Sequence, residues 1–417
     1  MIAANKRVLL ASLVGTSVEF YDFYIYATAA ALVFGPLFFP SDEPSLQLLA
    51  SYASLGVAFI ARPLGAWAFG HFGDRIGRKS TLVASLLLMG GSTLLIGFLP
   101  TYQTAGWLAP LLLCILRFGQ GFGLGGEWGG AALLAVENAP PGWRGRFGVV
   151  PQLGAPVGFV AANGLFLLLG TMMTAEQFMA WGWRIPFLLS IVLVGIGLWV
   201  RLKLSETPAF SAMLEEGPPP AVPLGELLRK HGWITLGATF GAVACFAVYY
   251  LATAFALGYG TTTLGIDRQV FLTMQLGAIL PMAISIALAG WFSDKWSPGL
   301  VLRWGCVAAI VAGLILAPAL ESGSLPIIFV ALSFSLTVMG FVYGPLGAWL
   351  PGLFPARVRY TGVSVAFNVA GVLGGALTPI AAVWLAAQPG GLIWVGLYLA
   401  GASSLSLIAL IALRKRG

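Results

Sequence analysis

Five charged side chains interrupt long apolar stretches of the sequence. They are Glu19, Asp22, Arg62, Arg117 and Glu127. If these stretches cross a bilayer, each ionisable group costs at least about 2.5–3.5 kcal/mol near its centre, so each needs a functional or structural reason. All five lie in the first half of the chain. Chemistry that moves a proton is therefore expected in that half.

Two of the stretches place opposite charges at matching depths. Glu19 and Asp22 are three residues apart and share one helix face. Arg117, Gln120 and Glu127 follow the 3.6-residue period of a later stretch. At about 1.5 Å per residue, Glu19 and Arg117 both lie roughly 16 Å from the start of their stretches. This is near the middle of a hydrocarbon core about 30 Å thick.

These faces predict a proton-coupling group made of Asp22, Glu19, Arg117 and Glu127. Our hypothesis is that Asp22 or Glu19 pairs with Arg117 and takes up a proton when substrate competes for the arginine. The alternative is a permanent ion pair that holds two helices together. Glu127 is either a second proton-exchanging group or one half of a gate ion pair with Arg62 or a loop arginine.

Polar and aromatic side chains near mid-depth are candidates for substrate contact. Arg117 can hold a carboxylate through two parallel hydrogen bonds, or it can pack against Glu19 alone. For each of the other candidates, ordinary helix packing explains the residue as well as ligand contact does. The candidates are Arg117, Tyr26, Gln120, Trp128, Asn163, Tyr249, Gln275, Tyr343 and Asn368, with Tyr21, Tyr24 and Tyr250 at similar depth.

The composition requires that most of the surface faces lipid. The 417 residues are 59% hydrophobic and 9% charged, whereas soluble domains carry about 25% charged residues. A membrane-crossing helix needs about 20 apolar residues. Twelve stretches meet this length and predict an all-α integral membrane protein with twelve transmembrane helices, at 8–38, 48–70, 80–100, 106–136, 147–171, 185–204, 232–258, 268–292, 302–320, 325–352, 358–387 and 392–413.

Basic residues and the longest polar segment predict the topology. If the N-terminus is cytoplasmic, 18 of the 22 Lys and Arg fall in cytoplasmic segments and two in outer loops, as the positive-inside rule requires. We therefore expect both termini in the cytoplasm. The linker 205–231 separates six-helix bundles at 1–204 and 232–417. Its segment Leu224–Lys230 either lies on the membrane surface as an amphipathic helix or is solvated.

Two motifs of the first half recur in the second half at nearly the same spacing. Residues 70–75 (GHFGDR) correspond to 290–295 (GWFSDK), and 144–147 (RGRF) correspond to 357–360 (RVRY). Such an internal repeat predicts two pseudo-symmetric bundles with the substrate site between them, near mid-membrane.

The sequence argues against several other classes of protein. Its three cysteines lie in apolar runs and its two histidines lie beside loop motifs, a pattern without metal-ligand spacing. We see no Ser/His pair, phosphate-binding loop or basic tract long enough for nucleic acid. We therefore expect neither an enzyme nor a nucleic-acid-binding protein. We expect no metal or cofactor, a proton gradient as the energy source, and a monomer in the lipid bilayer.

Several stretches resemble a known superfamily over essentially the whole chain, most densely in residues 10–205. Residues 70–79 (GHFGDRIGRK) resemble the helix 2–3 loop signature of the major facilitator superfamily, and 117–123 (RFGQGFG) resemble its helix 4 motif. Further stretches are similar to the metabolite:H⁺ symporter family, especially its shikimate-transporter branch: 19–24 (EFYDFY), 61–65 (ARPLG), 125–130 (GGEWGG) and 181–187 (WGWRIPF).

The resemblance implies the fold of that superfamily and a latch between helix ends that closes the cytoplasmic side. An ordinary positive-inside anchor is the alternative for the same residues. In the second half, Lys295 replaces the usual arginine and residues 296–298 (WSP) replace the Gly-Arg-Arg end, so the two latches differ in sequence. The latch residues implied are Gly70, Asp74, Arg75, Gly77, Arg78 and Asp294.

By this resemblance, the chain is expected to be a proton-coupled symporter of the bacterial inner membrane. It would import a small polar metabolite by alternating access, such as shikimate or a di- or tricarboxylate. Two alternatives stay open. One is a proton-coupled antiporter that exports small organic compounds, because residues 154–158 (GAPVG) faintly resemble an exporter motif. The other is an importer of betaine- or proline-like zwitterions.

Overall fold

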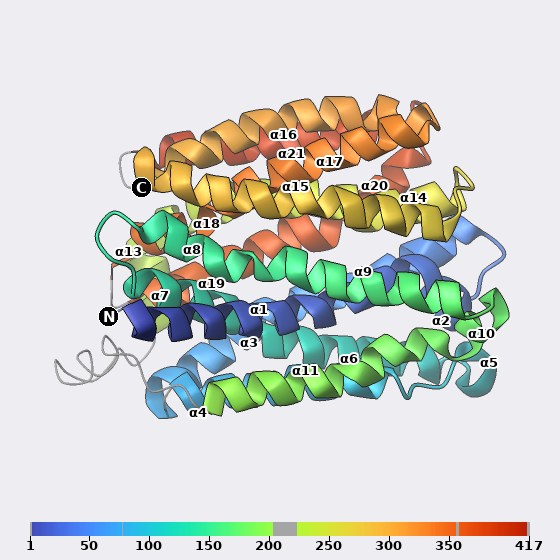
Figure 1. Cartoon of the computed structure of the whole chain (residues 1–417), viewed down its shortest axis with the longest axis horizontal. Helices are drawn as coiled ribbons and strands as arrows, with labels where there is room; N and C mark the ends of the chain where they lie inside the picture. The colour runs from blue at the N-terminus through green and yellow to red at the C-terminus, as the bar shows by residue number, and fades with distance from the viewer. Residues whose placement is uncertain (1, 77, 203–222, 356–357, 415–417) are drawn as a thin grey trace.

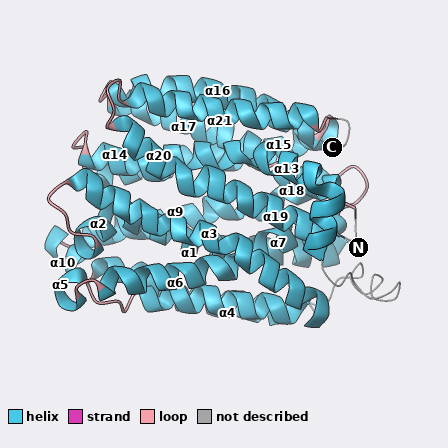
Figure 2. Cartoon of the chain, turned by 180° about the vertical axis from the view of Figure 1, so that it is seen from behind, coloured by secondary structure: helices cyan, strands magenta, loops and turns pink. Residues whose placement is uncertain are grey.

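The computed structural model describes residues 2–76, 78–202, 223–355 and 358–414, without side chains for 2–8, 70–82, 200, 201 and 223. Within these residues every regular element is a helix (Figure 2). The helices run along the long axis of the molecule, and Ile2 and Arg414 lie at the same end (Figure 1). We call this end the termini end and the opposite one the distal end.

The helices of each half form six spans. The spans of the first half are span 1 (α1, Ile2–Ala29; η1, Ala30–Phe34; α2, Gly35–Phe38), span 2 (α3, Pro44–Ile76), span 3 (α4, Arg78–Ile96), span 4 (α6, Leu108–Leu124; α7, Glu127–Glu137), span 5 (α8, Arg144–Gln152; α9, Gly154–Met172) and span 6 (α11, Ile185–Leu202). Those of the second half are span 7 (α13, Pro223–Tyr250; η3, Leu251–Phe255; α14, Ala256–Thr262), span 8 (α15, Arg268–Lys295), span 9 (α16, Pro298–Glu321), span 10 (α17, Leu325–Tyr343; α18, Leu346–Leu353), span 11 (α19, Arg359–Gly371; η5, Val372–Ala376; α20, Leu377–Ala386) and span 12 (α21, Leu392–Ala412).

The spans have the length and hydropathy of membrane helices. Eleven segments are long and apolar enough to cross a bilayer, and α4 contributes the shorter apolar stretch Val83–Ile96. The expected fold of twelve transmembrane helices is thereby confirmed. Three short helices lie in the distal loops: α5 (Tyr102–Ala105), α10 (Ala175–Ala180) and η2 (Gly182–Arg184).

Helix irregularities recur at equivalent places in the two halves. Spans 1 and 7 each contain a π-helical turn, η1 and η3. Spans 4 and 10 each break in the middle, at residues 125–126 and 344–345. Spans 5 and 11 are also irregular but at different places along the helix, span 5 at Leu153 and span 11 in the π-helical turn η5. The repeat seen in the sequence motifs is therefore also a repeat of backbone geometry.

The breaks correct the expectation of continuous helices at 106–136, 147–171 and 325–352. At the first break two glycines adjoin each other, and at the third Pro345 lacks the N–H that a continuous helix would use. The π-helical turns leave carbonyls that other spans satisfy. Ser51 Oγ donates to Ala30 O at 2.6 Å, and Gln275 Nε2 donates to Thr253 O at 2.9 Å.

A glycine seam allows spans 2 and 4 to approach closely. A Cβ atom on Gly65 would meet the backbone of Phe122, and one on Gly121 would meet the backbone of Ala58. A Cβ atom on Gly125 would likewise meet backbone atoms of span 2. Small residues at helix contacts serve this role in membrane proteins, where packing rather than water exclusion joins helices. We call Gly65, Gly121 and Gly125 the glycine seam.

The two halves contact each other at the termini end. Spans 5 and 8 lie side by side (Figure 1), as do spans 2 and 11. Asp294 of span 8 accepts hydrogen bonds from the backbone N–H groups of Gly145 and Arg146 at 2.6 and 3.1 Å, and from Arg146 Nε at 2.8 Å. Glu137 and Arg359 form a second ion pair between the halves at 3.6 Å. This end is therefore closed.

Hydrogen bonds also join the halves further along the molecule. Asn368 Nδ2 of span 11 donates to Gly125 O of span 4 at 2.8 Å, and the Tyr360 hydroxyl donates to Gly126 O. Towards the distal end, the Tyr52 hydroxyl of span 2 donates to Ala254 O of span 7. The contacts at both ends together hold the halves in an arrangement closed on both sides.

Part of the expected linker is helical. α13 begins at Pro223, and Glu226 pairs with Lys230 at 3.1 Å on its exposed side. His231, with φ −129° and ψ 18°, separates this short helical segment from the rest of span 7. Leu227 is buried and Leu228 is exposed. Residues 203–222 lie outside the described part of the chain, so the domain limits at 204 and 232 stay predictions.

Candidate functional site

A hydrogen-bonded chain inside the first half connects Asp22 to Arg117. Thr93 of span 3 donates to Asp22 Oδ2 at 3.2 Å. Gln120 Nε2 donates to Thr93 Oγ1 at 2.8 Å and to the backbone carbonyl of Asp22 at 3.1 Å. Gln120 Oε1 in turn accepts a hydrogen bond from Arg117 Nη1. We call Asp22, Thr93, Gln120 and Arg117 the buried relay; all four are essentially inaccessible to solvent.

Asp22 and Arg117 do not form the direct ion pair that we expected. Among the described residues, Asp22 Oδ1 and Arg117 Nε and Nη2 have no hydrogen-bond partner. The guanidinium lies instead over the rings of Tyr26, at 3.9 Å, and Phe23, at 4.6 Å. The physical reason for the difference is that Gln120, one turn along the same helix, occupies the position between the two charges.

A second group of charges faces a cavity between the two halves. The cavity has a volume of about 30 Å³, which is room for about two water molecules. Glu19 of span 1 and Arg62 of span 2 lie on its wall, and both are less than a tenth exposed. The rest of the wall is largely aromatic: Phe20, Phe23, Tyr24, Trp128, Phe246, Tyr249, Tyr250, Tyr343 and Phe367, with Ala155, Cys245 and Met339. We call this space the central cavity.

Arg62 is held in the wall by aromatic rings. Its guanidinium lies 4.7 Å from the ring centre of Phe23 and 5.0 Å from that of Phe59. Its Nε has no hydrogen-bond partner, and no ion pair joins Arg62 to another described residue. A guanidinium in this state has donors available for a ligand.

Trp128 closes one side of the central cavity by bridging the two halves. Its ring stacks on Phe367 of span 11, with centres 3.6 Å apart and planes within 3° of parallel. Its Nε1 donates to Gln152 Oε1 at 3.1 Å and lies 3.3 Å from the Tyr343 hydroxyl. This contact joins opposite halves. It therefore forms when the halves close around the cavity and breaks when they move apart.

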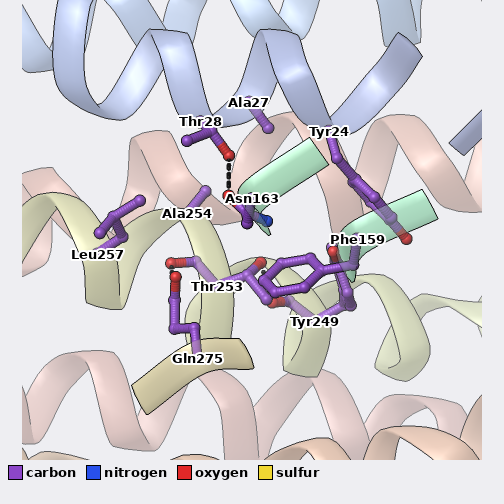
Figure 3. A pocket seen from close by; sticks show the side chains of 10 residues that line it. All are labelled: Tyr24, Ala27, Thr28, Phe159, Asn163, Tyr249, Thr253, Ala254, Leu257 and Gln275. Atoms are coloured by element: carbon purple, nitrogen blue, oxygen red, sulfur yellow. Dashed lines mark hydrogen bonds between the residues drawn. The ribbon is translucent and has the colours of Figure 1, made fainter. Parts of the chain in front are cut away.

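A smaller cavity of about 10 Å³ (Figure 3) shares the wall residues Tyr24 and Tyr249 with the central one. Thr28 donates to Asn163 Oδ1 at 2.5 Å, which leaves Asn163 Nδ2 without a partner among the described residues. The Tyr249 hydroxyl, between the two cavities, also lacks a partner there. Gln275 lines the smaller cavity, but its side-chain amide nitrogen already donates hydrogen bonds to two backbone carbonyls of span 7.

The structure separates the predicted substrate residues into two groups. Trp128, Asn163, Tyr249, Gln275 and Tyr343 line one or both cavities. Arg117, Tyr26, Gln120 and Asn368 line neither; the first three lie inside the first half, and Asn368 bonds across the halves.

Sequence reasoning missed Arg62 and Phe367 as cavity residues. In the sequence analysis, Arg62 is named only as a possible gate partner of Glu127. Its charge in the middle of an apolar stretch also indicated a possible contact with substrate. Phe367 carried no signal in the sequence, because an aromatic residue in a membrane helix is ordinary. Glu127 begins α7 and accepts a hydrogen bond from Ser85 at 2.7 Å.

Most of the predicted latch cannot be compared with the structure. Gly77 lies outside the described residues, and Gly70, Asp74, Arg75 and Arg78 lie in α3 and α4 at positions where side chains are not described. Asp294, the latch residue of the second half, makes the contacts with Gly145 and Arg146 given above.

Comparisons with known proteins agree with this architecture. The family model for "Sugar (and other) transporter" matches residues 8–217. The inner membrane metabolite transport protein YhjE of Escherichia coli (strain K12) is 49% identical over 98% of this chain and 94% of its own length. The chain belongs to the major facilitator superfamily of transporters. It is a multi-pass membrane transporter of metabolites, and its relatives are not enzymes.

Further relatives of this transporter are named for different substrates. The shikimate transporter of Escherichia coli (strain K12) is 38% identical, over 91% of this chain and 88% of the relative. The proline/betaine transporter of Salmonella typhimurium (strain LT2) is 31% identical, over 98% and 83%. The proton:xylose symporter XylE, solved with bound 6-bromo-6-deoxy-D-glucose, matches with a TM-score of 0.76 at 16% identity, over 99% of this chain and 95% of that one.

Proposed function

We propose that the transporter imports a small carboxylated metabolite together with protons, by alternating access. The observation that carries this proposal is the buried relay. In a closed bundle, an ionised Asp22 and an Arg117 without full hydrogen-bond partners both cost free energy. A proton on Asp22 removes one of these two charges. Closure around the relay and occupancy of Asp22 by a proton are therefore linked.

The central cavity supports a carboxylate as the recognised group. Arg62 presents donors to this cavity, and guanidinium binds carboxylates through paired charge-assisted hydrogen bonds. Shikimate, proline and betaine, for which two of the relatives are named, all carry a carboxylate. Arg62 takes the role that the sequence had suggested for Arg117, because Arg62 lies on the cavity wall.

The transporter would work in a bacterial inner membrane with its termini end in the cytoplasm. The excess of Lys and Arg in segments at that end favours this orientation. Spans 5 and 8, joined by Asp294 and Arg146, would separate to open the cytoplasmic side. Movement of one bundle against the other around a central site is the mechanism expected for transporters built from repeats.

The test is uptake by the purified transporter in proteoliposomes, with a substrate chosen by a thermal-shift screen of small acids and betaines. Asp22→Asn should abolish accumulation driven by an imposed pH gradient but keep exchange of labelled for unlabelled substrate. Glu226→Gln, at a position that lines neither the central nor the smaller cavity, is the matched control and should leave both activities intact. Uphill uptake unchanged in Asp22→Asn would exclude Asp22 from the mechanism. Substrate extrusion under the same gradient would favour an exporter.

A further inference from the structure

The break in span 4 leaves a backbone carbonyl that the helix itself does not use. In a continuous helix, Gly125 O would accept a hydrogen bond from the backbone N–H four residues later. In the part of the chain that the structure describes, no backbone N–H donates to this carbonyl. Its donor is the side chain of Asn368, in span 11 of the other half, at 2.8 Å. Because a buried carbonyl without a donor costs free energy, the break depends on this contact between the halves.

One face of span 11 follows the break in span 4. The Tyr360 hydroxyl donates to Gly126 O. A Cβ atom on Gly129 would meet Ser364 Oγ, so the missing side chain at this position allows span 11 to approach. Tyr360, Ser364 and Asn368 are spaced four residues apart and therefore share one helix face. The glycine-rich GGEWGG motif of span 4 is thus shaped for contact with the opposite half.

We propose that Asn368 and Tyr360 are positioning residues, which hold the broken segment of span 4 and thereby keep the termini side of the central cavity closed. We call this pair the span 11 clasp. The inference rests on the proposed alternating access and names contacts through which that side closes. Phe367, next to Asn368, stacks on Trp128 of the cavity wall. The clasp and the wall of the cavity therefore form and separate together.

The distal side of the molecule has a contact of the same kind. The Tyr52 hydroxyl of span 2 donates to Ala254 O, inside the π-helical turn η3 of span 7. On both sides, a polar side chain of one half donates to a carbonyl at an irregular part of a helix in the other half. Water can replace such a donor once a side opens. Each contact is therefore expected to stabilise closure of its own side.

Cys245 supplies a reporter of opening, because it lines the central cavity and is only 1% exposed. In a background with Cys114 and Cys306 replaced by serine, Cys245 is the one thiol left. Its rate of reaction with a charged, membrane-impermeant methanethiosulfonate would be measured in right-side-out and in inside-out membrane vesicles. No substrate or proton gradient is present, so the rate reports how often the cavity opens to the side that carries the reagent.

Asn368→Leu and Tyr360→Phe should each raise the rate at Cys245 about tenfold in inside-out vesicles and leave it unchanged in right-side-out vesicles. Each change leaves a carbonyl unsatisfied in the closed form but hydrated in the open form, and a tenfold shift is the size expected for one such group. Tyr52→Phe is the matched control and should act from the opposite side. Asn368→Gln keeps an amide donor and should restore part of the closed state.

Two results would overturn the proposal. One is an unchanged rate from the termini side in both clasp variants. The other is an equal increase from both sides, because that is general loosening of the structure. Melting temperatures in detergent show whether each variant is folded. Tyr360→Phe removes a single oxygen atom, so it keeps the test informative if Asn368→Leu does not fold.

The clasp and proton coupling fail separately. A transporter whose uptake ignores the pH gradient, but whose clasp variants open on the termini side, overturns proton coupling and leaves the clasp intact. A transporter with coupled uptake, whose labelling at Cys245 ignores the clasp variants, overturns the clasp alone.

Discussion

Gln120 connects the charged residues of the first half more directly than either charge does. Its amide oxygen accepts a hydrogen bond from Arg117, and its amide nitrogen donates one to Thr93. Both polar groups of this one side chain are therefore hydrogen-bonded away from water. A buried amide of this kind fixes the orientation of both neighbours. The separation of Asp22 from Arg117 is thus a property of this one residue.

Replacing Gln120 by leucine should destabilise the protein. The change leaves Arg117 Nη1 and the backbone carbonyl of Asp22 without their present partner, and an unsatisfied buried group costs about 1–3 kcal/mol. A lower melting temperature in detergent is expected. Gln103→Leu, at an exposed position in α5, serves as the control. Equal melting temperatures for the two variants would show that the relay contributes nothing to stability.

At the scale of the helix, the glycine seam sets the distance between spans 2 and 4. Gly65→Ala would place a methyl group against the backbone of Phe122, which cannot move aside as a side chain could. Overpacking of this kind costs about 1–3 kcal/mol. The expected result is a lower melting temperature and a reduced yield of folded protein.

Gly195→Ala is the matched control for this prediction. A Cβ atom at Gly195 in span 6 meets nothing within 4 Å, so the same change there should leave the melting temperature equal or slightly higher. If Gly65→Ala behaves like Gly195→Ala, then spans 2 and 4 are further apart than described.

The sequence predicted the spans but not their irregularities. Twenty apolar residues form a membrane helix whatever their partners, so the twelve spans were predictable. Glycine and proline are tolerated inside membrane helices, so Gly125 and Pro345 alone did not reveal the breaks in spans 4 and 10. The break at Gly125 depends on its contact with span 2, which is a property of packing.

The candidate site was predicted in part for the same reason. The free-energy cost of a charge inside an apolar stretch was enough to identify the candidate residues, which are Glu19, Asp22, Arg62 and Arg117. Which of them face the cavity depends on the rotation of each helix about its axis. That rotation is set by contacts such as Thr93 with Asp22, and a single sequence does not contain them.

At the scale of the molecule, transport requires the distal end to open, and a disulfide can prevent this. Gly56 of span 2 and Ala376 of span 11 belong to opposite halves, and a Cβ atom on Gly56 would lie 3.7 Å from Ala376 Cβ. This distance suits a disulfide. Gly56→Cys with Ala376→Cys, in a background with Cys114, Cys245 and Cys306 replaced by serine, should lose uptake on oxidation and regain it on reduction.

The single Gly56→Cys variant is the control, and it should transport under both conditions. Mass spectrometry establishes that the crosslink has formed. Full transport by crosslinked protein would mean that spans 2 and 11 stay together at this level throughout the cycle, contrary to the movement proposed for the two halves.

The small volume of the central cavity also bears on how well the membrane stays sealed. Two waters do not form a continuous file from one aqueous side to the other, and a proton needs such a file to hop across. With both ends shut, these two waters do not carry protons through the resting protein, which is what the coupling proposed above requires between transport cycles.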